Sequence, residues 1–161
     1  MTGEKREEVL RNTVLNAAYL GLSNIDAESR ARNNARKDYN ATFLGYVMKR
    51  FGDRWLIVSM GIGDGIIGLL GRDGHAELLS EPDGGEYVGQ TRFITMNEVW
   101  KNAPINRVRA FRVPDFDVIM SMTDGVSDPK FETDNNLKDG KLWLDFYANG
   151  NHDDRTLVLV Y

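Results

Sequence analysis

The chain has 161 residues, of which 42% are hydrophobic and 27% charged, a composition typical of one globular domain with a buried core. Its net charge of −4 and its lack of a basic block disfavour nucleic-acid binding. Cysteine is absent and the only histidines are His75 and His152, which excludes thiolate chemistry and histidine-rich metal sites. No run of residues has the length of a membrane span, and the polar N-terminus is unlike a signal peptide, so we expect a cytoplasmic protein with no membrane partner.

The first part of the chain is predicted to be helical. Residues 4–22 place apolar side chains among charged ones at a spacing that fits an amphipathic helix. Residues 24–37 are rich in Arg, Asn, Ala and Glu, and they indicate either a second, exposed helix or a polar connector.

The pattern changes to that of strands after the helical region. Residues 41–49 and 54–61 are predicted to be two strands joined by a short turn. Residues 66–70 and 75–79 flank a Gly-Arg-Asp-Gly turn and predict a second hairpin. We therefore expect a meander of four strands in a largely antiparallel sheet.

A long connection over residues 80–104 follows the predicted meander. It contains proline and three glycines, with a short helix expected over residues 96–101, and connections of this length are usually functional or mobile. The elements predicted after it are strands over 107–113, 116–122 and 156–161, and one or two short helices within 129–146. No internal repeat or linker divides the chain, so we expect a single α+β domain over residues 1–161.

The segment 118–128 combines a predicted buried strand with an acidic turn. Asp124 ends the strand within an Asp-Gly pair, and Asp128 follows four residues later. Two aspartates held close by a strand and a tight turn could form half of a site for Mg²⁺ or Mn²⁺, which prefer oxygen ligands. The Asp-Gly pair is also a common turn, so each one alone favours turn chemistry. The chain has five, at Asp64, Asp73, Asp83, Asp124 and Asp139.

Two further aspartates share the position of Asp124 at the end of a predicted strand. Asp64 follows the strand over 54–61, and Asp153 precedes the last strand. If these strands are neighbours in one sheet, the three side chains and Asp128 would gather at one edge. Carboxylates held that close repel one another unless cations lie between them, so the pattern predicts a divalent metal site.

A second motif points to a different function. Residues 63–68 match the dinucleotide-binding pattern G-x-G-x-x-G and follow a predicted strand. That pattern requires a helix to begin at the loop, whereas Asp73-Gly74 interrupts the chain a few residues later and a second strand-like run follows. Dinucleotide binding is therefore disfavoured.

Four segments, in order, resemble the metal-dependent protein phosphatases of type 2C. Residues 41–45 resemble the family's threonine-containing strand, and 62–65 resemble its G-D-S-R turn, with Gly65 in place of Ser and Ile66 in place of Arg. Residues 122–128 resemble the signature S-D-G-hydrophobic-x-D, and 152–156 resemble the terminal D-N-x-T/S, with Asp154 in place of Asn.

The resemblance implies a fold, a site and a reaction. The fold would be an antiparallel β-sandwich flanked by helices, with the site at one end. Asp124 and Asp153 would be ligands of a core pair of Mg²⁺ or Mn²⁺ ions, and Asp64 and Asp128 would join Asp124 at a further, weaker metal position. The segment 80–104 falls near the family's variable flap. Water activated by the metals would hydrolyse a phosphoserine or phosphothreonine monoester of a phosphorylated protein substrate, with no catalytic residues beyond the ligands.

The sequence also departs from the family pattern. No counterpart of the family's phosphate-binding Arg, first acidic residue or bridging Asp-Gly pair precedes the helix over 4–22. The resemblance covers roughly the C-terminal two thirds of a family member, so we expect an incomplete sandwich, either a truncation or a natural short form, whose exposed sheet edges could associate. Two alternatives therefore stay open: a non-catalytic pseudophosphatase or regulatory binding module on the same fold, and a structural domain whose aspartates only form turns.

Overall fold

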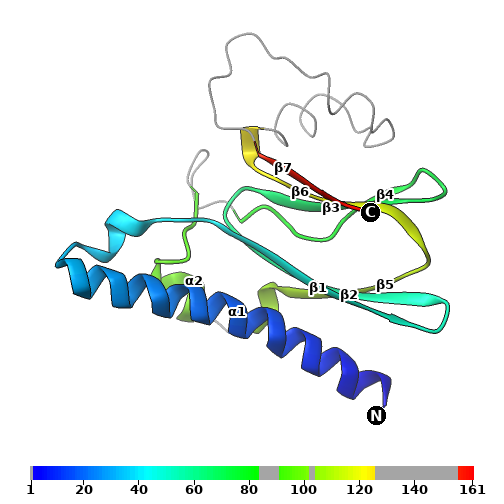
Figure 1. Cartoon of the computed structure of the whole chain (residues 1–161), viewed down its shortest axis with the longest axis horizontal. Coiled ribbons are helices and arrows are strands. Elements are labelled where there is room, and N and C mark those ends of the chain that lie inside the picture. Colours follow the sequence, from blue (N-terminus) through cyan, green and yellow to red (C-terminus); the bar gives the residue numbers. More distant parts are fainter. Residues whose placement is uncertain (1, 84–90, 102–103, 126–155) are drawn as a thin grey trace, which may run out of the picture.

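In the computed structural model of the chain, two antiparallel sheets stack face to face (Figure 1). A long helix lies on the outer face of one of them. The structure describes residues 2–83, 91–101, 104–125 and 156–161. The first sheet has the strand order β1-β2-β5, formed by Phe43–Phe51, Arg54–Ile62 and Val108–Val113. The second has the order β4-β3-β6-β7, formed by Ala76–Leu78, Ile66–Gly71, Phe116–Met122 and Leu157–Val160. The predicted α+β sandwich is confirmed.

Strand β2 is the centre of the core because it is buried on both faces. Its alternate residues Leu56, Val58, Met60 and Ile62 pack with Val14 and Ala18 of helix α1 (Gly3–Arg32). Ile57, on the opposite face of β2, packs against Ile67, Leu69 and Ile119 of the second sheet. This double burial explains why β2 is almost continuously apolar instead of alternating.

Helix α1 is longer than the helix predicted over residues 4–22. It continues through Gly21 and ends at Arg32, where Asn33 adopts a left-handed conformation with φ of 54°. Most of the polar segment expected to form a separate helix or a connector, residues 24–32, thus extends α1, because arginine, alanine and glutamate favour helix and Ile25 packs on the core. A short 3-10 helix, η1 (Arg36–Tyr39), leads into β1. None of the helices within the described ranges is long and apolar enough to cross a membrane.

The predicted hairpins are present, but the predicted four-stranded meander is wrong. Strands β1 and β2 pair with each other, and so do β3 and β4, yet β2 pairs next with β5 while β3 pairs with β6. The short connections at residues 63–65 and 114–115 each carry the chain from one sheet to the other. Strand periodicity reports only which residues alternate between the two faces, and it carries no information about which sheet a strand joins.

The described part of the connection after β4 contains two short elements. Helix α2 (Asn97–Lys101) confirms the helix expected over 96–101, and the 3-10 helix η2 (Pro104–Arg107) leads into β5. Trp100 of α2 packs its ring against Tyr19 of α1, with the ring centroids 4.6 Å apart. The helices predicted within 129–146 lie outside the described residues.

Candidate active site

The connection between β2 and β3 crosses from one sheet to the other in three residues, and two glycines make this possible. Gly63 has φ of 106°, and a Cβ atom there would lie 2.4 Å from Cγ2 of Thr42. A Cβ atom at Gly65 would lie 2.9 Å from the carbonyl oxygen of Met122. Both distances are shorter than packed atoms allow, so each position requires glycine. The backbone on both sides of Asp64 is therefore tightly fixed, and the departure of Gly65 from the family's serine has a steric reason.

The register between β3 and β6 brings Asp64 and Asp124 to the same end of the second sheet. Ile66 pairs with Met122 in an antiparallel ladder, and each aspartate lies two residues beyond that pair. Asp124 accepts a hydrogen bond from the backbone N–H of Gly125 at 2.8 Å. The pairing of β3 with β6 thus places Asp64 and Asp124 at one end of the second sheet. The predicted pairing was different, because β2, the strand that precedes Asp64, lies in the first sheet.

Strand β7 begins at this same end. The N–H of Thr123 donates to the carbonyl of Thr156 at 3.1 Å, and the N–H of Thr156 donates to the Thr123 hydroxyl at 3.0 Å. The chain that enters β7 therefore reaches the sheet beside Asp124. Asp153, three residues before Thr156, lies outside the described residues, as does Asp128.

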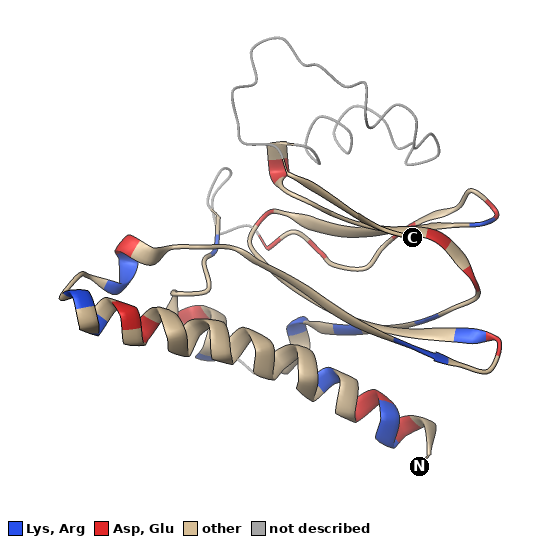
Figure 2. Ribbon diagram, viewed as in Figure 1, with Lys and Arg blue, Asp and Glu red and all other residues tan. Residues whose placement is uncertain are grey.

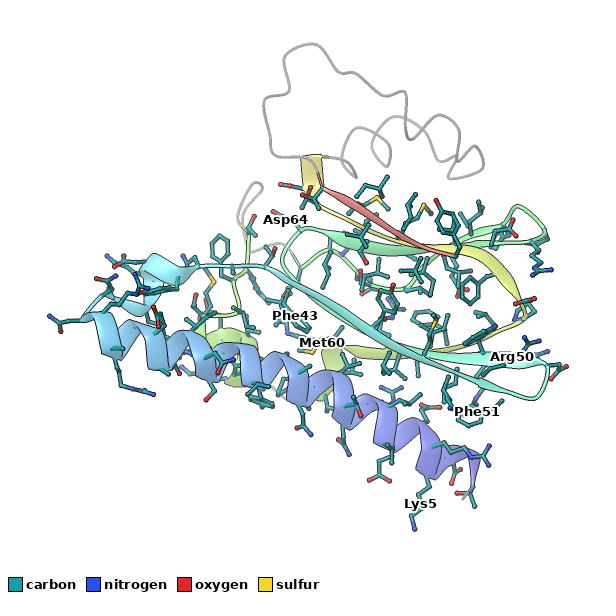
Figure 3. The ribbon with its side chains drawn as sticks, in the orientation of Figure 1. Lys5, Phe43, Arg50, Phe51, Met60 and Asp64 are labelled. Carbon is teal, nitrogen blue, oxygen red and sulfur yellow. The ribbon has the colours of Figure 1, made fainter. Side chains whose placement is uncertain are left out.

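A cavity of about 500 Å³ opens between the two aspartates. It is lined by Asn40, Ala41, Thr42, Leu44, Asp64, Gly65, Thr91, Phe93, Thr123 and Asp124. Its polar side chains carry carboxylate, amide and hydroxyl oxygens. Figure 3 shows Asp64 on the side of the molecule away from helix α1. Side chains with only oxygen ligands suit a hard divalent cation, so the residues present fit Mg²⁺ or Mn²⁺.

The predicted flap region contributes directly to this cavity. The hydroxyl of Thr91 donates a hydrogen bond to Oδ2 of Asp64, which orients that carboxylate. Thr91 and Phe93 both line the cavity. Thr91, which contacts Asp64, and Asn40, which lines the cavity, were not identified from the sequence, because nothing in their local pattern places them beside the aspartates.

Asp83 anchors the beginning of the connection between β4 and β5. Its carboxylate pairs with Arg92 at 3.3 Å and with Arg107, and its backbone N–H donates to the carbonyl of Gly63 at 2.7 Å. The Asp83 side chain is only 13% exposed, so these contacts are largely shielded from water. Asp83, predicted only to form an Asp-Gly turn, therefore fixes the turn that carries Asp64.

Two of the four predicted metal ligands are shown to share one cavity. Asp64 and Asp124 line it together, while the positions of Asp128 and Asp153 are not described. Within the described ranges, no group of three or more acidic or histidine residues could hold a metal ion. The described part of the site therefore supplies two carboxylates, supported by hydroxyl and amide oxygens.

The fold is an antiparallel sandwich with two aspartates at one end of its second sheet. Comparison with known families identifies the class of protein to which this fold belongs. The family model described as protein phosphatase 2C matches residues 2–153, and the chain belongs to this family. The predicted family is thus confirmed, and its members are typically metal-dependent. Comparisons with curated proteins and with solved structures found no match.

Proposed function

We propose that the chain is a Mg²⁺- or Mn²⁺-dependent phosphatase that hydrolyses phosphoserine and phosphothreonine monoesters of protein substrates in the cytoplasm. The observation that carries this proposal is the register of β3 and β6, which puts Asp64 and Asp124 on one cavity in a chain of the protein phosphatase 2C family. In this proposal Asp128 and Asp153 complete the set of ligands.

The residues around the cavity have distinct roles in this proposal. Asp64 and Asp124 would hold divalent cations, and the contacts from Thr91 and from the N–H of Gly125 orient their carboxylates. When bound, the cations would neutralise charge on the phosphoryl oxygens and lower the pKa of a water molecule toward neutrality. Phe93 adds an apolar wall to the cavity, and electrostatic interactions are stronger beside apolar groups than in bulk water.

Hydrolysis of p-nitrophenyl phosphate and of a phosphothreonine peptide tests the proposal. With Mn²⁺ added, we expect turnover that a chelator abolishes and that Asp64→Asn or Asp124→Asn lowers at least about tenfold, since even indirect support of a metal ligand is worth about 10–100-fold. The matched control is Asp73→Asn. Asp73 is also followed by glycine, but its carboxylate accepts the N–H of His75 at 2.9 Å in the β3–β4 turn. Turnover that persists in chelator, or that falls equally in the control, would contradict the proposal.

A second candidate is a pseudophosphatase that binds a phosphorylated partner without hydrolysing it. The observation that favours it is the presence of only two carboxylates on the described part of the cavity. It predicts that a phosphothreonine peptide binds without turnover, and that binding survives Asp124→Asn. Loss of both binding and turnover in this variant favours the enzyme.

A further inference from the structure

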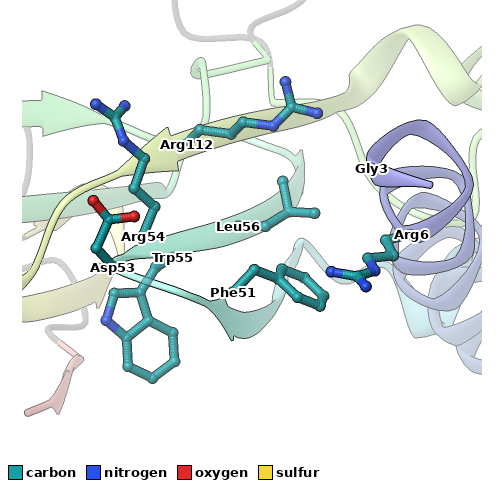
Figure 4. A pocket seen from close by; sticks show the side chains of 8 residues that line it. All are labelled: Gly3, Arg6, Phe51, Asp53, Arg54, Trp55, Leu56 and Arg112. Atoms are coloured by element: carbon teal, nitrogen blue, oxygen red, sulfur yellow. The ribbon is translucent and has the colours of Figure 1, made fainter. Parts of the chain in front are cut away.

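A second pocket, of about 200 Å³, lies between the first turn of α1 and the β1–β2 turn, and it plays no part in the proposed phosphatase site. Figure 4 shows the residues that line it: Gly3, Arg6, Phe51, Asp53, Arg54, Trp55, Leu56 and Arg112. We propose that this pocket binds a phosphomonoester dianion carried on an aromatic body.

Sheet register explains the apolar floor of the pocket. Phe51 pairs with Arg54, and Leu56 pairs with Arg112, so these four side chains share one face of the first sheet. This is the face on which α1 packs, as the contacts of Leu56 and Phe51 with the helix-facing core show. The first turn of α1, with Gly3 and Arg6, lines one side of the pocket. Phe51, which is half-buried, and the buried Leu56 form the apolar floor of the pocket, with Arg6 over one face of the Phe51 ring.

The charge of the pocket favours an anion. Arginines at positions 6, 54 and 112 stand against a single acidic residue of the lining, Asp53, in a chain whose net charge is −4. Among the described residues, neither Arg6 nor Arg54 forms an ion pair, and Arg6 lies over the Phe51 ring at 4.6 Å. Figure 2 shows Lys and Arg in blue at both the β1–β2 turn and the start of α1. One guanidinium group can donate to two phosphate oxygens at once, so arginines without an acidic partner on the rim favour a phosphate dianion.

Arg112 and the helix add to this preference. Glu7 accepts from one nitrogen of Arg112 at 2.9 Å and from Arg11 at 3.0 Å, which holds the Arg112 side chain in place. The first turn of a helix also presents N–H groups without intrahelical acceptors, and Thr2 makes no side-chain capping hydrogen bond there. The floor therefore selects an apolar body, and the rim selects negative charge.

The size of the pocket limits its occupant. Sites for drug-sized ligands measure about 300–1,000 Å³, so this smaller pocket suits one ring with one phosphoryl group. Two kinds of ligand have this chemistry: a phosphotyrosine-like side chain of a polypeptide, and a small aryl phosphate.

The test measures binding of phenylphosphonate, which cannot be hydrolysed, by calorimetry in chelator, so that no metal can draw it to the Asp64–Asp124 cavity. We expect phenylphosphonate to bind about tenfold more tightly than methylphosphonate, since the ring covers apolar surface. Arg54→Gln should weaken binding about threefold and the double variant Arg6→Gln/Arg54→Gln about tenfold, with further loss near 0.5 M salt.

Matched controls separate this site from the phosphatase site. Arg30→Gln makes the same change at an exposed position in the last turn of α1 and should bind like the unaltered chain. Asp124→Asn should also leave binding unchanged. Equal binding of the two phosphonates, or losses no larger in Arg54→Gln than in Arg30→Gln, would overturn the proposal whether or not the chain is a phosphatase.

A peptide arm identifies the source of the ligand. A peptide with phosphonomethyl-phenylalanine that binds the unaltered chain more tightly than phenylphosphonate, with the same dependence on Arg54, assigns the pocket to phosphorylated polypeptides. Affinity equal to that of the free probe assigns it to small aryl phosphates. A peptide that binds independently of Arg54 would contradict a polypeptide ligand in this pocket.

Discussion

The two ends of the first sheet differ in charge and in how their charged groups are positioned. At the end where β2 leads into β3, Asp64 lies between Gly63 and Gly65, where the Thr42 side chain and the Met122 carbonyl leave no room for a side chain. At the end that carries the β1–β2 turn, the charge sits on long, exposed arginine side chains such as Arg112 of β5, which is 57% exposed. We refer to these as the acidic end and the cationic end. We infer from this comparison that the fold positions the charged groups of the acidic end rigidly, whereas the charged groups of the cationic end contribute little to the free energy of folding.

The difference also bears on function. An anionic ligand is repelled by aspartates unless cations accompany it, but it is attracted by arginines without any cofactor. A phosphorylated protein could therefore engage the two ends by different chemistry. The predictions below test how far the ends differ, beginning with the largest expected effect.

Substitution of Gly63 should destabilise the protein most. Gly63→Ala forces an alanine to φ of 106° and places Cβ 2.4 Å from the Thr42 side chain, so we expect a loss of about 3 kcal/mol in the free energy of unfolding. Urea denaturation monitored by tryptophan fluorescence would measure it. Adding Thr42→Ala should recover part of the loss, because it removes the overlapping methyl group but not the backbone strain.

A glycine at the cationic end provides the matched control. Gly52 in the β1–β2 turn has φ of 65°, but a Cβ atom there would meet nothing within 4 Å. Gly52→Ala should therefore cost only about 1–2 kcal/mol, the cost of the left-handed conformation itself. Equal losses at Gly52 and Gly63 would show that the acidic end is no more tightly built than the other end.

Mn²⁺ should stabilise the acidic end in a way that depends on its aspartates. At a concentration 100-fold above the dissociation constant, a ligand that binds only the folded state adds about 2.7 kcal/mol. We expect the melting temperature to rise with Mn²⁺ concentration, and Asp124→Asn to remove most of that rise. Asp73→Asn should keep it, because Asp73 lies in the β3–β4 turn and outside the cavity. A rise that is the same in all three proteins would argue against a metal site at Asp124.

The sequence was sufficient to predict the features that depend on local pattern. Alternation and turn residues located β2 and β3 to within a residue, and the position of Asp64 and Asp124 at strand ends predicted that they would meet. The two aspartates line one cavity, but the predicted reason was wrong. The strand before Asp64, β2, lies in the other sheet, and it is β3, the strand after Asp64, that pairs with β6 through Ile66 and Met122.

Features that depend on distant contacts could not be predicted in this way. The pairing of Asp83 with Arg107 spans 24 residues, and that of Thr91 with Asp64 spans 27, and neither leaves a periodic signal. The sequence also could not predict which sheet each strand joins. Strand β2, for example, is buried on both faces, and its apolar pattern would be the same in either sheet. The full length of α1 was missed because its last turns are mostly polar.

The Asp83 contacts should make a moderate contribution at the acidic end. Asp83→Asn removes the negative charge between Arg92 and Arg107, whose side chains are 31% and 21% exposed, so we expect a loss of about 1–2 kcal/mol. Chemical denaturation would measure it. The control is Glu81→Gln, which breaks the pair with Arg109 at a side chain that is 74% exposed and should cost under about 0.5 kcal/mol. Similar small losses in both variants would mean that Asp83 does not anchor the turn.

The arginines of the cationic end should contribute least to stability. Arg54→Gln and Arg112→Gln should each change the free energy of unfolding by less than about 0.5 kcal/mol, because exposed ion pairs such as Arg112–Glu7 are worth about 0–1 kcal/mol. A double-mutant cycle with Glu7→Gln would isolate that pair, measured by urea denaturation at low and high salt. If these variants cost as much as Asp83→Asn, the arginines would be explained by folding alone. If the variants lose little stability but bind phenylphosphonate more weakly, ligand binding would be the physical role of the clustered arginines.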